Sequence, residues 1–242
     1  MKIFNLFFIL QLILLSCESE TNPANTRGNS INKIMPLGAS RVEGNRPNHE
    51  SYRYELWKKL KDNNWDFDFI GTQKDNASYN NFQNEIFDND HEGHSGSISF
   101  EIANNLSQWL TSAAVPDIVL FSSPGGNDGL HNLPYNETIT NIKTIISILQ
   151  TNNPNVTVII EILAPANSNI MTTELTNYLE QIKSDIPLIA AEKTTATSQV
   201  ITVDMNTGFT DSLLADDVHY NETGAKFIAD KYYEKLETIL VD

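Results

Sequence analysis

Residues 34–44 read IMPLGASRVEG, an apolar run that breaks off in Gly38-Ala39-Ser40 and passes into a loop rich in Gly, Asn and Pro. A buried parallel strand delivers a small polar side chain to the carboxyl edge of its sheet in this way. Gly38 permits a tight turn, and Ser40 then lies at the mouth of the sheet with its hydroxyl free. Taken alone, the stretch is better explained as a strand that ends in a turn, and its significance comes from the other end of the chain.

Length and composition fit a single domain. The chain has 242 residues, of which 40% are hydrophobic, and this suits one α/β domain with a sizeable core. It carries 16 basic and 31 acidic residues, a net charge of −15. This acidic balance argues against nucleic acid and anionic membrane surfaces as partners.

The first residues resemble an export signal. Met1-Lys2 precede an apolar run over residues 3–15 that is too short for a comfortable membrane span. Leu14-Leu15-Ser16-Cys17 looks like a bacterial lipobox, so residues 1–16 are predicted to be a lipoprotein signal peptide and Cys17 the lipidated residue. The alternative is an ordinary secretory signal with an incidental cysteine. Cys17 is the only cysteine, which excludes a disulfide and a thiol nucleophile.

The domain boundaries follow from composition. Residues 17–30 have no apolar periodicity and are predicted to be a flexible tether between lipid and domain. The predicted location is therefore the cell envelope, with an N-terminal lipid anchor as the only membrane contact. Residues 31–242 form the predicted catalytic domain.

Strands and helices alternate along that domain. Buried strands are predicted at residues 31–37, 66–71, 116–121, 156–163 and 200–204. Helical spacing predicts helices at residues 54–62, 98–110, 137–150, 172–186, after Pro187, and 222–240. This order implies a five-stranded parallel sheet with helices on both faces. The polar, Asn-rich residues 76–90 are expected to form an excursion over the active edge.

Four polar loops, at residues 38–40, 94–96, 125–128 and 216–219, are expected to converge at the carboxyl edge of this sheet. Ser40 can act as a nucleophile and His219 as its base, with Asp216 orienting the imidazole from three residues away. The N–H groups of Ser40 and Gly96 and the Asn127 amide can donate hydrogen bonds to an oxyanion. A side chain at residue 96 would obstruct the reacting carbonyl.

Other kinds of site find less support. His91 and His94 with Asp88 and Asp90 could be a metal cluster, but their spacing does not match H-E-x-x-H. The chain contains neither the G-x-S-x-G of a nucleophile elbow nor a phosphate-binding GxxxxGK[ST] loop. We therefore expect neither a metal nor another cofactor.

Ser, Gly, Asn and His, in four blocks in this order, resemble the SGNH (GDSL-type) hydrolase superfamily over about residues 31–240. The segments IMPLGAS, SYRYELWKKL, DFDFIGTQ, HEGHSG, PDIVL and DDVHYNETGAKFIA look most like its acetylxylan-esterase-like branch, carbohydrate esterase family three. The resemblance implies a three-layer flavodoxin-like fold, serine ester hydrolysis without a metal, and O-acetylated carbohydrate as substrate. Two departures stand out: Ala39 replaces the family Asp, and Ser122-Ser123-Pro124 add a residue before the Asn block.

The predicted protein is a secreted, lipid-anchored serine esterase that removes O-acetyl groups from a polysaccharide or oligosaccharide. One alternative is a lipid-directed esterase or thioesterase of the same superfamily. It would need an apolar groove beside Ser40, whereas residues 45–50 and 76–90 are polar. The other alternative is a catalytically silent carbohydrate-binding lipoprotein. Ala39 could suggest it, but the intact Ser, Asn, Asp and His positions oppose it.

Overall fold

The computed structural model describes residues 32–241. The predicted signal peptide (1–16), Cys17 and the tether (17–30) lie outside the described residues. Within the described part, no helix is both long enough and apolar enough to cross a bilayer.

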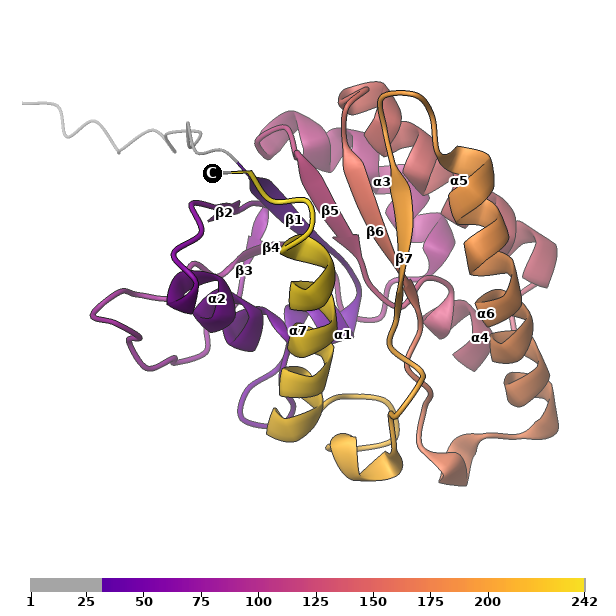
Figure 1. Ribbon diagram of the computed structural model, residues 1–242. Coiled ribbons are helices and arrows are strands. Elements are labelled where there is room, and N and C mark those ends of the chain that lie inside the picture. Colours follow the sequence, from indigo (N-terminus) through magenta and orange to yellow (C-terminus); the bar gives the residue numbers. More distant parts are fainter. Residues whose placement is uncertain (1–31, 242) are drawn as a thin grey trace, which may run out of the picture.

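A twisted sheet forms the centre of the molecule (Figure 1). Its strand order over the described residues is β3-β4-β1-β5-β6-β7, with β2 pairing beside β1. Five strands run parallel: β4 (Asp90–Gly93), β1 (Lys33–Gly38), β5 (Ile118–Phe121), β6 (Thr157–Ile162) and β7 (Val200–Asp204). The edge strand β3 (Gln73–Lys74) is antiparallel to β4. Parallel strands bring their carboxyl ends to one edge, and β1 delivers Ser40 there.

One strand of the prediction is wrong. The strand predicted at residues 66–71 shrinks to the two-residue β2 (Asp68–Phe69), and its place in the parallel sheet is taken by β4. The sequence of β4, DHEG, has no apolar run. Its buried Glu92 is tolerated because it accepts hydrogen bonds from the N–H and hydroxyl of Thr72. A Cβ at Gly71 would lie 2.0 Å from the His91 carbonyl oxygen, so only glycine lets the chain pass β4 this closely.

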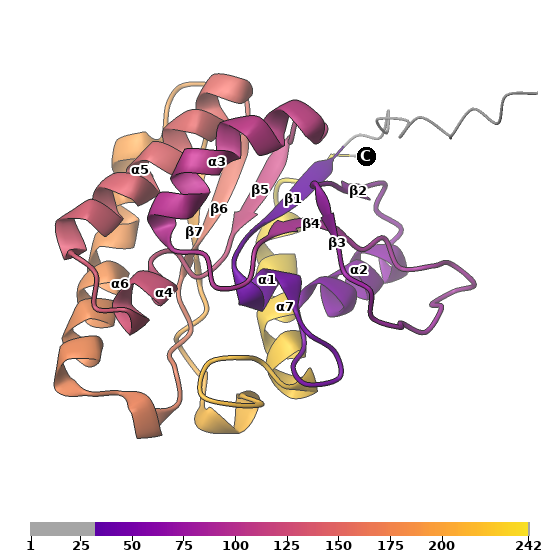
Figure 2. The same cartoon turned by 180° about the vertical axis from the view of Figure 1, so that it is seen from behind.

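Helices cover both faces of the sheet, and this confirms the predicted three-layer α/β fold. Alternate residues of β1, β5 and β6 point to opposite faces and contribute to two separate hydrophobic clusters. Helices α3 (Ser99–Ser112), α5 (Tyr135–Asn152) and α6 (Thr173–Lys193) cover one face (Figure 2). Helices α2 (Arg53–Asp62) and α7 (Glu222–Leu236) cover the other.

Two short helices and two 3-10 turns complete the fold, and two helices differ from their predicted boundaries. Short helices α1 (Ser40–Glu43) and α4 (Gly126–Leu130) follow β1 and β5, and the 3-10 turns are η1 (Ser168–Ile170) and η2 (Asp211–Leu213). Helix α6 runs unbroken through Pro187 instead of ending before it, and α7 ends at Leu236 rather than residue 240.

The excursion predicted over the active edge also lies elsewhere. The loop that follows β3 packs beside α2, where Tyr79 and Phe87 contact Tyr54 and Trp57 with ring centroids 5.0–5.6 Å apart. Its aromatic residues, not its many asparagines, determine where it lies, because burying aromatic area is more favourable than exposing it.

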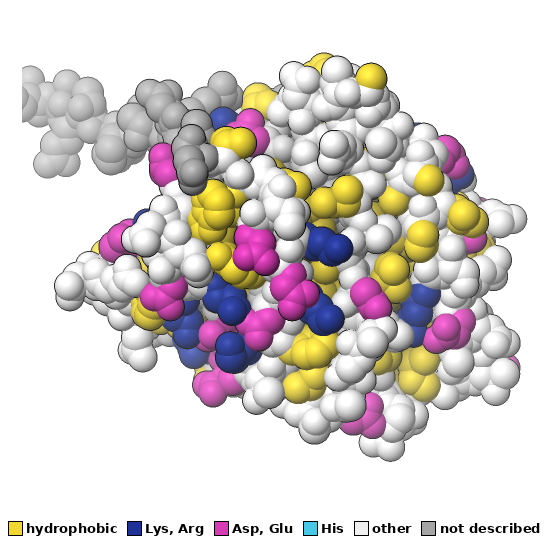
Figure 3. Space-filling model, viewed as in Figure 1, with side chains coloured by type: hydrophobic (Ala, Val, Ile, Leu, Met, Phe, Trp, Pro, Cys, Tyr) yellow, Lys and Arg dark blue, Asp and Glu magenta, His cyan; other side chains and the backbone are white. Residues whose placement is uncertain are grey.

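Charged side chains are mixed on the face that α2 and α7 present (Figure 3). Basic and acidic groups alternate there, and Lys59 on α2 pairs with Asp230 on α7 at 2.9 Å. The acidic excess of the chain therefore does not form a single-sign patch on this face.

Candidate active site

Ser40, His219 and Asp216 meet at the carboxyl edge of the sheet. His219 Nε2 lies 2.9 Å from Ser40 Oγ, and His219 Nδ1 lies 2.7 Å from Asp216 Oδ2. Gly38 makes the exit from β1 possible, because a Cβ there would lie 2.8 Å from Val42 Cγ2 and 3.0 Å from the Ser122 carbonyl oxygen. The geometry is that of a nucleophile, a base and a group that orients the base.

Asp216 is fixed by its own loop. Its Oδ1 accepts hydrogen bonds from the N–H groups of Val218 and His219 at 2.9 and 2.8 Å, which leaves Oδ2 for the imidazole. Desolvation alone would raise the pKa of Asp216, but these N–H groups and the imidazole outweigh it and lower the pKa to about 2. The carboxylate is therefore ionised at any pH at which the enzyme works.

Arg41 ties the two ends of the site together. Its guanidinium is nearly buried and donates from Nε to the Val218 carbonyl at 2.7 Å. It also donates to the carbonyls of Ala164 and Pro165 at 2.9 and 3.0 Å, and lies over the Tyr220 ring. Because Arg41 follows Ser40 and Val218 precedes His219, this one side chain links the loop of Ser40 to the loop of His219. No local sequence pattern predicts this contact.

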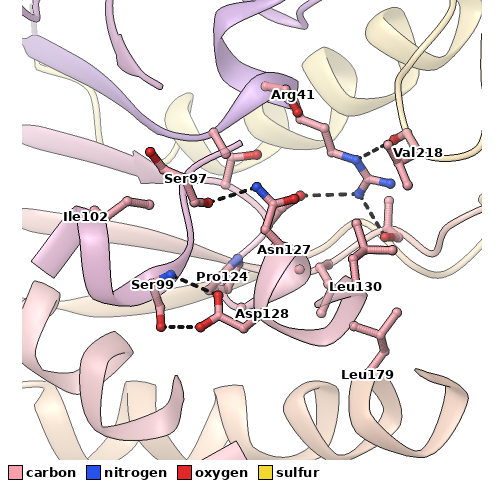
Figure 4. Close-up of a pocket in the computed structure, with 18 of the residues that line it drawn as sticks. Arg41, Ser97, Ser99, Ile102, Pro124, Asn127, Asp128, Leu130, Leu179 and Val218 are labelled. Atoms are coloured by element: carbon pink, nitrogen blue, oxygen red, sulfur yellow. Dashed lines mark hydrogen bonds between the residues drawn. The ribbon is translucent and has the colours of Figure 1, made fainter. Parts of the chain in front are cut away.

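The predicted oxyanion donors lie around the same point. Gly96 has φ +79°, the left-handed region, and a Cβ there would meet nothing within 4 Å. Glycine is thus required by the backbone conformation, and the open space in front of it is the site itself. Asn127 on α4 donates from Nδ2 to the Ser97 carbonyl at 2.8 Å, which leaves its second amide hydrogen available (Figure 4).

Asp128, next to Asn127, anchors α4. It is buried and accepts hydrogen bonds from the N–H and hydroxyl of Ser99 at 2.9 and 2.6 Å (Figure 4). Its Oδ1 also accepts a hydrogen bond from the Thr138 hydroxyl at 3.0 Å. Gly125 begins the helix at φ +73°, where a Cβ would clash with Ile182 and Thr138 at 2.8 Å. The left-handed turn at Gly125 thus starts the short helix that carries Asn127, which lines the same groove as Ser40.

The alternative metal cluster is not formed. No group of three or more His, Cys, Asp or Glu among residues 32–241 is arranged to hold an ion. His94 instead stacks on Trp109, with ring centroids 3.8 Å apart. The side chains have other partners: His91 with the Gly93 N–H, His94 with Glu92, Asp88 with the Phe69 N–H, and Asp90 with Lys74.

Two hollows of different character flank Ser40. One is an apolar cavity of about 50 Å³ whose walls include Ile102, Leu163 and Leu179 (Figure 4). The other is a polar groove of about 540 Å³, lined by Glu43, Asn45, His49, Ser95, Gly96, Asn127 and His219. An ester bound at Ser40 would thus have one small apolar space and one large polar space for its two halves.

Proteins similar to this chain are found among solved structures. No family model matches the chain, and no curated protein matches it. Among solved structures, the family 3 carbohydrate esterase of Clostridium thermocellum is 32% identical, with 86% of this chain and 96% of that chain covered and a TM-score of 0.70.

Two further structures extend the likeness. An acetyl esterase, solved as a serine-to-alanine mutant with acetate ion, is 29% identical over 86% of this chain and 97% of that one, with a TM-score of 0.72. A G-D-S-L family protein of Desulfitobacterium hafniense is 12% identical over 85% of this chain and 99% of that one, with a TM-score of 0.58, and shares the fold. The chain belongs to carbohydrate esterase family 3, shares its fold with the G-D-S-L family protein, and is an esterase.

Proposed function

We propose that this esterase removes O-acetyl groups from carbohydrate through a Ser40–His219–Asp216 acyl-enzyme mechanism. The observation that carries the proposal is the hydrogen-bonded series from Ser40 Oγ to His219 to Asp216, at 2.9 and 2.7 Å, at the junction of a small apolar cavity and a larger polar groove.

The mechanism follows from the positions of the donors and acceptors. Ser40 Oγ attacks the ester carbonyl while its proton passes to His219 Nε2, and Asp216 stabilises the imidazolium through Nδ1–H. The N–H groups of Ser40 and Gly96 and the Asn127 amide donate to the oxyanion, each worth roughly 3 kcal/mol. The bond between the acyl carbon and the alcohol oxygen then breaks, and the alcohol leaves with the proton from His219. A water molecule hydrolyses the acyl-Ser40 ester by the reverse path.

The apolar cavity supports acetate as the acyl group. A space of about 50 Å³ holds only a few water-sized groups, so it accepts an acetyl methyl but not an eight-carbon chain. This argues against the lipid-directed alternative, which needs a long apolar groove beside Ser40. The acetyl esterase and the family 3 carbohydrate esterase among the similar structures also support a short acyl group.

The polar groove supports a sugar as the alcohol. Glu43 lines the groove, and because its Oε2 accepts the Ser95 N–H at 2.6 Å, its Oε1 can accept a hydrogen bond from a sugar hydroxyl. Asn45 adds an amide that can both donate and accept. Sugar hydroxyls need such paired donors and acceptors, whereas a lipid alcohol does not.

The intact hydrogen bonds oppose the silent-binding alternative. Ala39 cannot supply the family carboxylate, yet its carbonyl oxygen accepts the N–H groups of Val42 and Glu43, both at 3.0 Å. These bonds hold the turn that presents Ser40. We therefore attribute to Ala39 an effect on the surroundings of the site and not a loss of the nucleophile.

The lipid anchor on Cys17 is part of the proposal. Asn32 hydrogen-bonds to Val241 in both directions, so the two ends of the described chain lie together at the amino end of β1 (Figure 1). The catalytic residues lie at the opposite end of that strand. A tether entering at Asn32 would thus hold the active edge away from the membrane, within reach of polysaccharide.

Two experiments test these claims. Hydrolysis of p-nitrophenyl acetate, butyrate and octanoate should be confined to the shortest ester and should be abolished by Ser40→Ala. Preference for octanoate would support the lipid-directed alternative. If the folded protein hydrolysed none of the three esters, that result would support the catalytically silent alternative. For the anchor, a bacterial host fed labelled palmitate should label the wild type and not Cys17→Ala; equal labelling would exclude Cys17 as the acceptor.

A further inference from the structure

A second imidazole lies against the proposed base. His49 stacks on His219 with ring centroids 3.9 Å apart and planes 11° from parallel. Backbone hydrogen bonds hold the two rings in place: Asn45 and His49 exchange two hydrogen bonds of 3.2 Å, and the Glu50 N–H donates to the Tyr220 carbonyl at 2.8 Å. The loop that carries His49 is thus joined to Tyr220, the residue that follows His219.

The polarity of the His49 ring is not explained by its hydrogen bonds. The side chain is only 8% exposed, and its Nδ1 is buried without a hydrogen-bond partner among the described residues. Buried polar atoms are usually paired, so this unpaired nitrogen calls for an explanation. The ring's other neighbour is the groove where the substrate alcohol would bind.

The surroundings of His49 disfavour a charge on its ring. Desolvation lowers the pKa of His49, and the nearby His219 lowers it further, against the opposing carboxylates of Asp216 and Glu43. A neutral aromatic face is attractive to a cation lying over it. During the reaction His219 becomes such a cation, and His49 covers one of its faces.

We propose that His49 is a positioning residue for His219. Its ring fixes the plane of the base so that Nε2 faces Ser40, and it shields one face of the imidazolium from water. The proposal rests on the proposed role of His219 as the base. In this role His49 acts through His219 and does not contact the reacting atoms.

The test uses two variants of similar size and polarity, His49→Phe and His49→Leu, assayed with p-nitrophenyl acetate. Phe keeps an aromatic face on His219 and Leu does not. We expect His49→Leu to lower kcat about tenfold with KM within about twofold, and His49→Phe to remain within about threefold of wild type. The exposed His131, replaced by Ala, is the control and should leave kcat unchanged.

Thermal unfolding of each variant separates positioning from folding, because a loss of kcat in a variant that is still folded at the assay temperature does not come from unfolding. Wild-type kcat in His49→Leu would overturn the proposal, and so would equal losses in both variants, since the aromatic face would then be irrelevant. His219→Ala tests the proposed function separately. Full activity in that variant would show that His219 is not the base, independently of the result for His49.

Discussion

Arg41 Nε donates a hydrogen bond of 2.7 Å to the carbonyl oxygen of Val218, 177 residues further along the chain. The bond joins the residue after Ser40, the proposed nucleophile, to the residue before His219, the proposed base. The distance between Ser40 and His219 is therefore set by a buried guanidinium as well as by the sheet that carries both loops.

Arg41→Met should weaken both the fold and the reaction. It leaves the carbonyls of Val218, Ala164 and Pro165 without their donor, so we expect a loss of roughly 2–4 kcal/mol in the free energy of unfolding. Displacement of the base should lower kcat by about 10²-fold. Urea unfolding and p-nitrophenyl acetate kinetics measure the two effects. Lys59→Met, which removes a surface cation paired with Asp230, is the control, and matching losses there would contradict this role of Arg41.

Asp216→Asn should leave the loop in place and remove catalysis. The amide oxygen can still accept the Val218 and His219 N–H groups, but its NH₂ would face Nδ1 and favour the wrong tautomer of the imidazole. We expect kcat to fall about 10³–10⁴-fold with little change in Tm. Because the pKa of Asp216 is about 2, protonating this carboxyl should not contribute to any loss of activity between pH 4 and 7. More than a tenth of wild-type kcat in the variant would argue against this role.

Gly96→Ala and Gly208→Ala form a matched pair. Both glycines have positive φ, +79° and +85°, and neither Cβ would meet an atom closer than 3.7 Å. Each substitution should cost about 1–2 kcal/mol of stability through backbone strain alone. Only Gly96→Ala should also lower kcat, by about tenfold or more, because it shifts an oxyanion donor. Equal activity in the two variants would exclude Gly96 from the oxyanion hole.

His91 should make stability depend on acid pH. Desolvation, followed by the nearby Arg53 and His94, lowers the pKa of His91 to about 2. Below about pH 6.5 the unfolded chain binds a proton at this imidazole and the folded chain does not. The free energy of unfolding should therefore fall with decreasing pH from about 6.5 toward 2, by up to roughly 1.4 kcal/mol per pH unit.

The variant His91→Asn isolates this contribution, because its side-chain oxygen can replace Nδ1 as acceptor for the Gly93 N–H. Burial raises the pKa of Asp88 to about 6, which opposes the effect between about pH 4 and 6 in both proteins. Urea unfolding at pH 7, 6 and 5 should show the difference between variant and wild type changing with pH. A constant difference would mean that His91 is protonated in the folded state.

Most of the fold could be predicted from the sequence because its core elements carry their own periodicity. The apolar spacing of α3 and α5 and the continuous apolar runs of β5 and β6 report burial directly. Strand β4 was missed for the opposite reason. Its buried Glu92 is tolerated because of Thr72, and the close backbone passage beside it depends on Gly71, and neither relationship is visible in a local pattern.

The candidate site divides in the same way. Ser40, Asn127, Asp216 and His219 could be predicted because each lies in a small polar block after an apolar segment, and Gly96 because it lies in the HSG block. Arg41 and His49 could not be predicted, because their roles depend on contacts with Val218 and His219, which lie near the other end of the sequence. Asp128 had a usable signal, since it adjoins Asn127 and lies in the first turn of a helix.

The most direct test of the central claim is the rate of p-nitrophenyl acetate hydrolysis by the wild-type protein and by Ser40→Ala, with folding of both verified by thermal unfolding. A serine nucleophile predicts a loss of about 10⁴-fold or more in kcat at unchanged Tm. A Ser40→Ala protein that is folded and retains wild-type turnover would contradict the assignment of Ser40 and, with it, the mechanism.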